Sequence, residues 1–154
     1  MIVSYKVELD AKRHPVLVKE KENQYSSDFL LSPEDVVKLC NDMLRLKFLA
    51  EEYVIMIATD TKYRILGIFT ISHGTVDVSV CNPREVFIRA LLVGASRIFI
   101  IHNHPSGDCS PSGVDLKIAM NLETIGNMMG IEMTDFIIIG GDGFYSSSKN
   151  KDIK

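Results

Sequence analysis

The order of apolar and polar residues along the chain predicts strands and helices in alternation. Short runs that are mostly apolar, or apolar at every second position, are typical of strands. Such runs occupy residues 2–9, 15–20, 52–59, 64–72, 75–80, 97–101, 131–140 and 144–148. The run at 97–101 is short and apolar after its first residue, which predicts a central strand, and the glycines of 140–143 predict a turn between the last two strands.

Three further segments repeat their apolar residues every three or four positions, which predicts helices. Each follows a residue suited to cap a helix, namely Ser32, Asn82 and Ser112. The helices are expected over residues 33–49, 83–95 and 113–129. The core side of the third is expected to consist of Val114, Ile118, Leu122, Ile125 and Met129. Helices that alternate with strands predict an α/β fold, a mixed sheet flanked by helices.

The length and composition of the chain predict a single domain over residues 1–154. Apolar residues make up 46% of the chain, enough for a full core, and no low-complexity tract interrupts it. Residues 1–30 are expected to form a strand extension and residues 31–149 the core. No apolar run reaches the roughly 18 residues of a membrane span. Three scattered cysteines, with no CxxC pair and no signal peptide, indicate a reduced, cytoplasmic protein.

The charge of the chain does not favour a nucleic-acid partner. The net charge is −3, the sequence pI is about 5.8, and Lys12-Arg13 is the only adjacent basic pair. Proteins that bind DNA tightly usually carry a basic face. A local basic patch stays open as an alternative, and the sequence does not determine the oligomeric state.

His102 and His104, two of the four histidines, stand where the central strand is expected to end. Residues two apart on a strand face the same side, so both rings can point at one spot while Asn103 faces away. Ligands commonly bind at strand ends in α/β sheets. A short loop then leads to Asp115, whose carboxylate can fold back beside the histidines. Three such ligands with an open fourth position are typical of catalytic zinc.

A zinc-bound water requires a base that accepts its proton, and the sequence offers two candidates. Glu51 and Glu52 both lie at the start of a buried strand, beside an otherwise apolar run. The residues alone do not choose between them. Ser112 is a candidate donor of a hydrogen bond to a developing oxyanion.

Simpler interpretations of the same stretch stay open. Ser112 and Asp115 have the spacing of a helix cap, and two histidines at a strand end can merely form hydrogen bonds there. Cys109 is expected to have no ligand role, and His14 and His73 are expected to be surface or turn residues. An HNH nuclease is excluded because its named residues are widely spaced. A zinc deaminase is excluded because H-x-E and P-C-x-x-C are absent.

The run HNHPSGDCSPSGVD at residues 102–115 resembles the JAMM (JAB/MPN) metalloprotease motif, and specifically its RadC branch. The segments 72–96 and 130–146 look like those that flank the motif in RadC proteins. The resemblance covers residues 30–149, nearly the whole chain. It implies a cytidine-deaminase-like JAMM/MPN fold that holds one zinc ion per chain. The ligands that it implies are His102, His104 and Asp115.

The resemblance also implies a reaction, the hydrolysis of a peptide or isopeptide bond in an unidentified peptide or protein substrate. It favours Glu52 as the general base, because the glutamate of the family lies eight residues before an Asp or Asn, here Asp60. Ser112 would support the oxyanion or the bound water.

Two departures accompany the resemblance. RadC proteins commonly begin with a helix-hairpin-helix DNA-binding domain, for which this chain has no room. Phe136 follows Asp135, where the family usually has a histidine. Two other hypotheses therefore stand beside the hydrolase, a non-catalytic JAMM-like scaffold and an accessory protein in DNA repair or processing. The acidic chain argues against the latter, and the complete set of ligand types argues against a decayed site.

Overall fold

The computed structural model of the protein describes residues 1–74 and 81–151. In this part of the chain seven strands form one sheet, in the order β2-β1-β4-β3-β5-β6-β7. The pairs β1–β4 and β5–β6 are parallel and the others antiparallel, so the sheet is mixed, as predicted. The strands are β1 (Ile2–Leu9), β2 (Pro15–Asn23), β3 (Tyr53–Thr59), β4 (Ile65–His73), β5 (Arg97–Asn103), β6 (Glu132–Ile139) and β7 (Phe144–Ser146).

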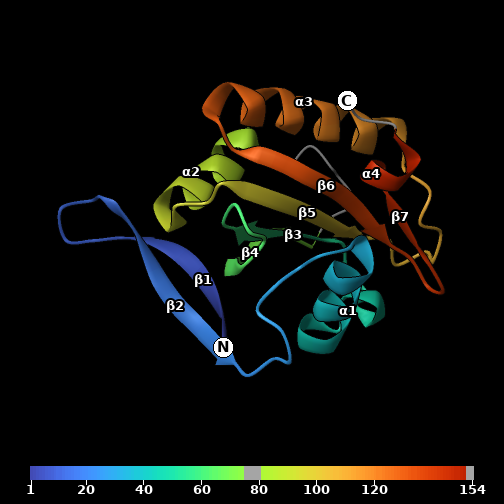
Figure 1. The fold of residues 1–154 in the computed structure, drawn as a ribbon, viewed down its shortest axis with the longest axis horizontal. Coiled ribbons are helices and arrows are strands. Elements are labelled where there is room, and N and C mark those ends of the chain that lie inside the picture. The colour runs from blue at the N-terminus through green and yellow to red at the C-terminus, as the bar shows by residue number, and fades with distance from the viewer. Residues whose placement is uncertain (75–80, 152–154) are drawn as a thin grey trace.

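Helices cover both faces of the sheet, which confirms the predicted α/β architecture. Figure 1 shows α2 (Pro83–Val93) and α3 (Gly113–Met129) on one face and α1 (Pro33–Leu44) on the other. Each face has its own apolar core, with Phe87 and Leu122 among the residues on the α2–α3 side and Leu39 on the α1 side. The central strands β3 and β5 are buried between these layers, which explains why both are nearly continuous apolar runs.

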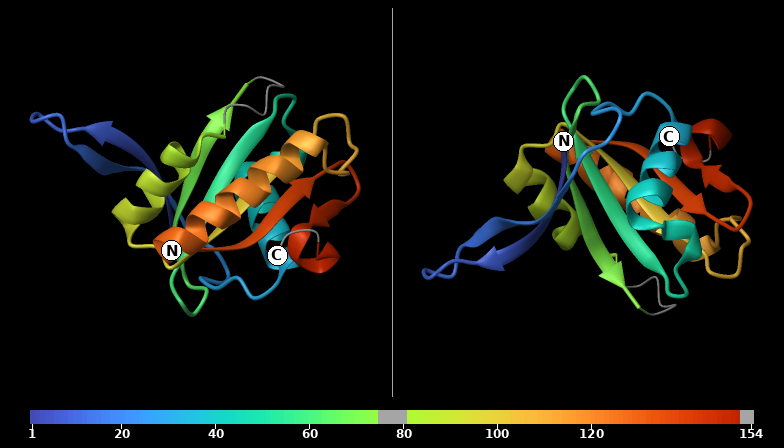
Figure 2. Two further views of the ribbon diagram at one scale, coloured as in Figure 1. Left: turned by 90° about the horizontal axis from the view of Figure 1, so that it is seen from above. Right: turned by 90° about the horizontal axis from the view of Figure 1, so that it is seen from below.

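The β1–β2 hairpin projects from one end of the sheet (Figure 2). Its base is anchored by Ile2, which is 2% exposed and packs in the core below α1. The two predicted N-terminal strands are thus present, and β2 runs on to Asn23. The predicted strand at residues 75–80 lies outside the described residues. No helix in residues 1–74 and 81–151 combines the length and the apolar character that a membrane crossing requires.

All three predicted helix caps are present. The side chains of Ser32, Asn82 and Ser112 accept hydrogen bonds from backbone N–H groups in the first turns of α1, α2 and α3. The predicted end of the first helix, near residue 49, is wrong. The helix α1 ends at Leu44 because Arg45 adopts a left-handed conformation (φ 53°), and a 3-10 turn (Leu46–Phe48) follows, which places Leu46 in the core.

The predicted core side of the third helix is partly wrong. Leu122 is fully buried, but Val114 and Met129 are 50% and 40% exposed. Ile118 and Ile125 are partly buried against the core, but the buried residues of the helix, apart from Leu122, are small or polar: Asp115, Ala119 and Gly126. The small residues let the helix approach closely, since a Cβ at Gly126 would lie 2.4 Å from the carbonyl oxygen of Ile131. Hydrophobic spacing selects large apolar residues and does not indicate the small and polar residues that lie closest to the sheet.

The last predicted strand, 144–148, is shorter than expected. The strand β7 ends at Ser146, and Ser147–Asn150 form the short helix α4. The cause is the buried carboxylate of Asp135, which accepts hydrogen bonds from the hydroxyls of Ser146, Ser147 and Ser148 and from the N–H of Ser148. These bonds turn the chain away from the sheet.

Replacing Asp135 by alanine is expected to lower the free energy of unfolding by about 3 kcal/mol, because three hydroxyls lose a charged acceptor in a buried place. In a domain of this size the midpoint of thermal unfolding would fall by about 6–12 °C, as measured by calorimetry. Asp142→Ala is the control, since Asp142 is exposed in the turn 140–143. Equal midpoints for the two variants would contradict the structural role of Asp135.

Candidate metal centre

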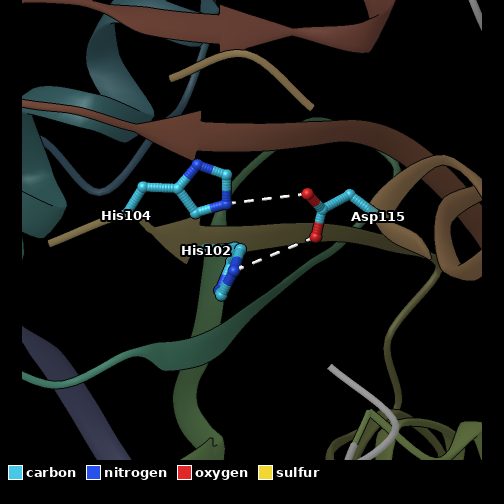
Figure 3. Close-up of side chains that lie close together, drawn as sticks. All are labelled: His102, His104 and Asp115. Carbon is cyan, nitrogen blue, oxygen red and sulfur yellow. Dashed lines mark ion pairs between the residues drawn. The ribbon is translucent and has the colours of Figure 1, made fainter. Parts of the chain in front are cut away.

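The centre lies at the end of β5, where His102 and His104 bring their rings together. The ring centroids are 4.8 Å apart and the rings are nearly perpendicular, at 88°. Asp115, in the first turn of α3, completes the group, as Figure 3 shows. One ligand-type atom from each of the three residues lies within 4.8 Å of the others. The chain thus brings together the three residues that the sequence selected.

Backbone carbonyls orient both imidazole rings. The Nδ1 of His102 lies 3.0 Å from the carbonyl oxygen of Tyr53, and the Nδ1 of His104 lies 2.7 Å from that of Asp108. A carbonyl can only accept, so each Nδ1 carries a hydrogen, and the nitrogen left to release its proton and bind a cation is Nε2 in both rings. Both Nε2 atoms point at Asp115, at 3.9 Å from His102 and 3.6 Å from His104. This arrangement is typical of metal-binding histidines.

The two oxygens of Asp115 have different tasks. Its Oδ2 accepts the backbone N–H of Ser112 at 2.7 Å, while the hydroxyl of Ser112 accepts the backbone N–H of Asp115 at 3.1 Å. This is a capping box, so the helix-cap interpretation is confirmed. The Oδ1 atom faces His102 and has no hydrogen-bond partner. Asp115 therefore serves its own helix and the histidines at once.

The group fits a metal ion, because two of its polar atoms are buried without a partner. His102 Nε2 and Asp115 Oδ1 both have buried positions and no hydrogen bond. Leaving such atoms without a partner costs about 1–3 kcal/mol each. Two imidazole nitrogens and a carboxylate oxygen are ligands that zinc accepts. A cation among them would satisfy both atoms.

The electrostatics of the group keep Asp115 ionised at neutral pH. Burial raises the pKa of Asp115, but the interaction with His104, the bonds with Ser112 and the charge of His102 outweigh it, and the pKa is lowered to about 2. The interaction with Asp115 raises the pKa of His104, although burial acts in the opposite sense. The centre therefore offers an anionic ligand to a cation.

The structure separates the two candidate glutamates. Glu52 directs its carboxylate to the histidines, with Oε2 3.7 Å from His102 Nε2, and its side chain is only 17% exposed. Glu51 points elsewhere and pairs with His73, its Oε2 3.0 Å from the Nε2 of His73 and its side chain 56% exposed. Of the two, Glu52 lies within reach of a water at the centre, as the resemblance implied.

Three other residues singled out by sequence take different places. Ser112 caps α3, so its hydroxyl oxygen is occupied as an acceptor while its hydrogen remains available for donation. Cys109 packs beside Gly140 and Gly143 and is outside the ligand group. Phe136 is 2% exposed in the apolar core on the α2–α3 side. At the position where the resemblance leads us to expect a histidine, this chain thus has a core side chain.

Sequence reasoning missed the groups that hold the ligands. The carbonyls of Tyr53 and Asp108 carry no sequence signal, since every residue has a carbonyl. The loop after His104 is fixed by close backbone contacts, in which the N–H of Gly141 donates to the carbonyl of Gly107 at 2.9 Å. A Cβ at Gly140 would lie 2.4 Å from that same carbonyl oxygen. The glycines of 140–143 are the one signal in the sequence, and their pattern predicts a turn but not this contact with the loop.

Comparison with known proteins agrees with this geometry. A family model described as RadC-like JAB domain matches residues 30–153. A UPF0758 protein of Alkaliphilus metalliredigens is 43% identical over 115 residues, which are 75% of this chain and 49% of the relative. A UPF0758 protein of Caldanaerobacter subterraneus subsp. tengcongensis is 38% identical over 149 residues, 97% of this chain and 61% of the relative.

A third UPF0758 protein, from Clostridium perfringens, is 45% identical over 121 residues, 79% of this chain and 52% of the relative. The chain thus spans about half the length of the curated relatives it matches. The matched region contains the central strand, its two histidines and the loop to Asp115. By this match over most of its length, the chain belongs to the RadC-like JAB domain family.

Proposed function

We propose that this protein is a zinc-dependent, metallopeptidase-type hydrolase that cleaves a peptide or isopeptide bond in a peptide or protein substrate. The observation that carries the proposal is the pair of buried, partnerless atoms, His102 Nε2 and Asp115 Oδ1, together with the carboxylate of Glu52, which lies 3.7 Å from His102 Nε2. The family supports it, because JAB domains include zinc peptidases. We also propose a cytoplasmic location, which suits the sparse, unpaired cysteines.

His102, His104 and Asp115 would hold the ion through two nitrogens and one oxygen, a set that leaves a fourth position open. When bound, zinc supplies Lewis-acid chemistry, which lowers the pKa of a coordinated water to about 7 and polarises a carbonyl oxygen. The carbonyls of Tyr53 and Asp108 keep both Nε2 atoms turned toward Asp115, so that the three residues would hold the ion between them. The low exposure of His102 and Asp115 limits competing water.

Glu52 would act as the general base. Its carboxylate, close to His102 Nε2, can accept the proton of the attacking water and later deliver it to the nitrogen of the leaving amine. The hydroxyl hydrogen of Ser112 is the proposed donor to the developing oxyanion, because the hydroxyl oxygen alone is used by the cap.

Metal analysis of the full chain, purified without chelators, tests the proposal first. We expect one zinc ion per chain, and zinc added at 1,000 times its dissociation constant should raise the free energy of unfolding of the stripped protein by about 4 kcal/mol. Cleavage is then measured on a panel of peptides and isopeptide-linked conjugates, with and without chelator. Absence of zinc, or cleavage that the chelator does not affect, would overturn the proposal.

A further inference from the structure

Asn103, the residue between the two histidines, is attached to the main chain on both sides of Glu52. Its Nδ2 donates to the carbonyl of Glu51 at 3.0 Å, and its Oδ1 accepts the N–H of Tyr53 at 2.7 Å. The residue is 1% exposed, so these bonds are shielded from water. Asn103 thus faces away from the histidine pair, as predicted, but it contacts the neighbours of the proposed base.

These side-chain bonds connect the two strands beyond the end of their backbone pairing. The last paired residues of β3 and β5 are Val54 and His102. Glu52 precedes β3, so no backbone pairing with β5 holds it. On the other side, the carbonyl of Glu52 accepts the N–H of Gly74 at 3.0 Å. The segment that carries Glu52 is therefore attached to β5 through the amide of Asn103.

An amide suits this position because it donates and accepts at once. The Asn103 side chain satisfies one carbonyl and one N–H, two groups that are two residues apart. A carboxylate would accept from Tyr53 but would repel the carbonyl of Glu51. An apolar side chain would leave both groups without that partner.

We propose that Asn103 is a positioning residue that holds Glu52 at the metal centre, an inference that rests on the proposed function of Glu52. Tyr53 links the two parts of the centre, since its N–H is bonded to Asn103 and its carbonyl to His102. One peptide segment thereby fixes both the proposed base and a metal ligand. The residue between the histidines acts through Glu52 and not on the ion.

A double-mutant cycle on zinc affinity tests the inference without a substrate. The dissociation constant is measured by competition with a chromophoric chelator for the unchanged chain, Asn103→Ala, Glu52→Gln and the double variant. The carboxylate of Glu52 attracts the cation, so we expect Glu52→Gln to weaken binding about tenfold. Asn103→Ala should weaken it about three- to tenfold when Glu52 is present, because a displaced carboxylate loses part or all of that attraction, and less than twofold when Glu52 is already replaced.

The coupling distinguishes positioning from general support of the structure. A loss of the same factor in both backgrounds would overturn the inference, because Asn103 would then act on the histidines or on the fold. Unchanged affinity in Asn103→Ala would also overturn it. No zinc binding by the unchanged chain would overturn the proposed function and this inference with it, whereas zinc binding without coupling overturns the inference alone.

Two further variants complete the design. Asn103→Asp preserves the shape and the acceptor for Tyr53 but loses the donor to Glu51, so it replaces Asn103→Ala if that variant does not fold. The direct effect of its charge on zinc is present with and without Glu52 and cancels in the cycle. Asn41→Ala is the matched control. Asn41 also accepts a backbone N–H, that of Lys47 at 3.1 Å, but lies at the end of α1, and its loss should leave the zinc affinity unchanged.

Discussion

Replacing Glu52 by glutamine is expected to lower the rate of the proposed hydrolysis at least about a hundredfold, the usual contribution of a positioned base, while one zinc ion per chain is retained at saturating metal. Glutamine preserves the size of the side chain but accepts protons poorly. The ligand atoms of His102, His104 and Asp115 are untouched by the change. Rate and zinc content are measured on the same preparation.

Glu51→Gln is the control for this variant. Glu51 is the neighbour in sequence, but its side chain pairs with His73 at the surface, and the bond between its carbonyl and Asn103 does not depend on the side chain. We expect its rate to equal that of the unchanged protein. A large loss of rate in Glu51→Gln together with a normal rate in Glu52→Gln would show that Glu51 is the base and that our proposal is wrong.

Asp115→Asn is expected to weaken zinc binding about a thousandfold, because it removes the anionic ligand, whose attraction for a nearby cation is worth roughly 4 kcal/mol. The asparagine oxygen can still accept the N–H of Ser112, so the start of α3 should survive. The affinity is measured by chelator competition, and the stability of the metal-free protein by chemical unfolding.

Ser112→Ala separates the two tasks of Asp115. It removes the hydroxyl that caps α3, which should cost about 1 kcal/mol of stability, and it leaves the three metal ligands in place. We expect normal zinc stoichiometry in this variant. Tight zinc binding by Asp115→Asn, or equal zinc loss in both variants, would show that Asp115 acts only through its helix.

The sequence allowed the ligand group to be predicted because local rules determine it. The two-residue period of a strand brings His102 and His104 to one side, and a cap at Ser112 places Asp115 in the first turn of α3. The choice of Glu52 over Glu51 needed the family resemblance, since both precede the same strand. The direction of each glutamate side chain depends on how the start of β3 lies against β4 and β5. These contacts join residues that are far apart in the sequence.

Other features depend on tertiary packing and were missed. The end of α1 depends on a left-handed Arg45 and the burial of Leu46. The core face of α3 depends on how closely Gly126 approaches Ile131. Hydrophobic spacing marks the positions of large apolar side chains. It gives no sign of a small residue that lets a neighbouring backbone approach closely. The carbonyls that orient the histidines cannot be recognised from residue types either.

The capping box at Asp115 helps to order the metal ligands during folding, before any metal binds. The carboxylate and both imidazoles are each restrained by a backbone bond of the chain itself, to Ser112, Tyr53 and Asp108. The entropy of ordering these side chains therefore belongs to folding and not to metal uptake. We therefore expect metal binding to a site that is already ordered, with only a small change in heat capacity on binding. In a classical zinc finger, by contrast, the metal organises the fold.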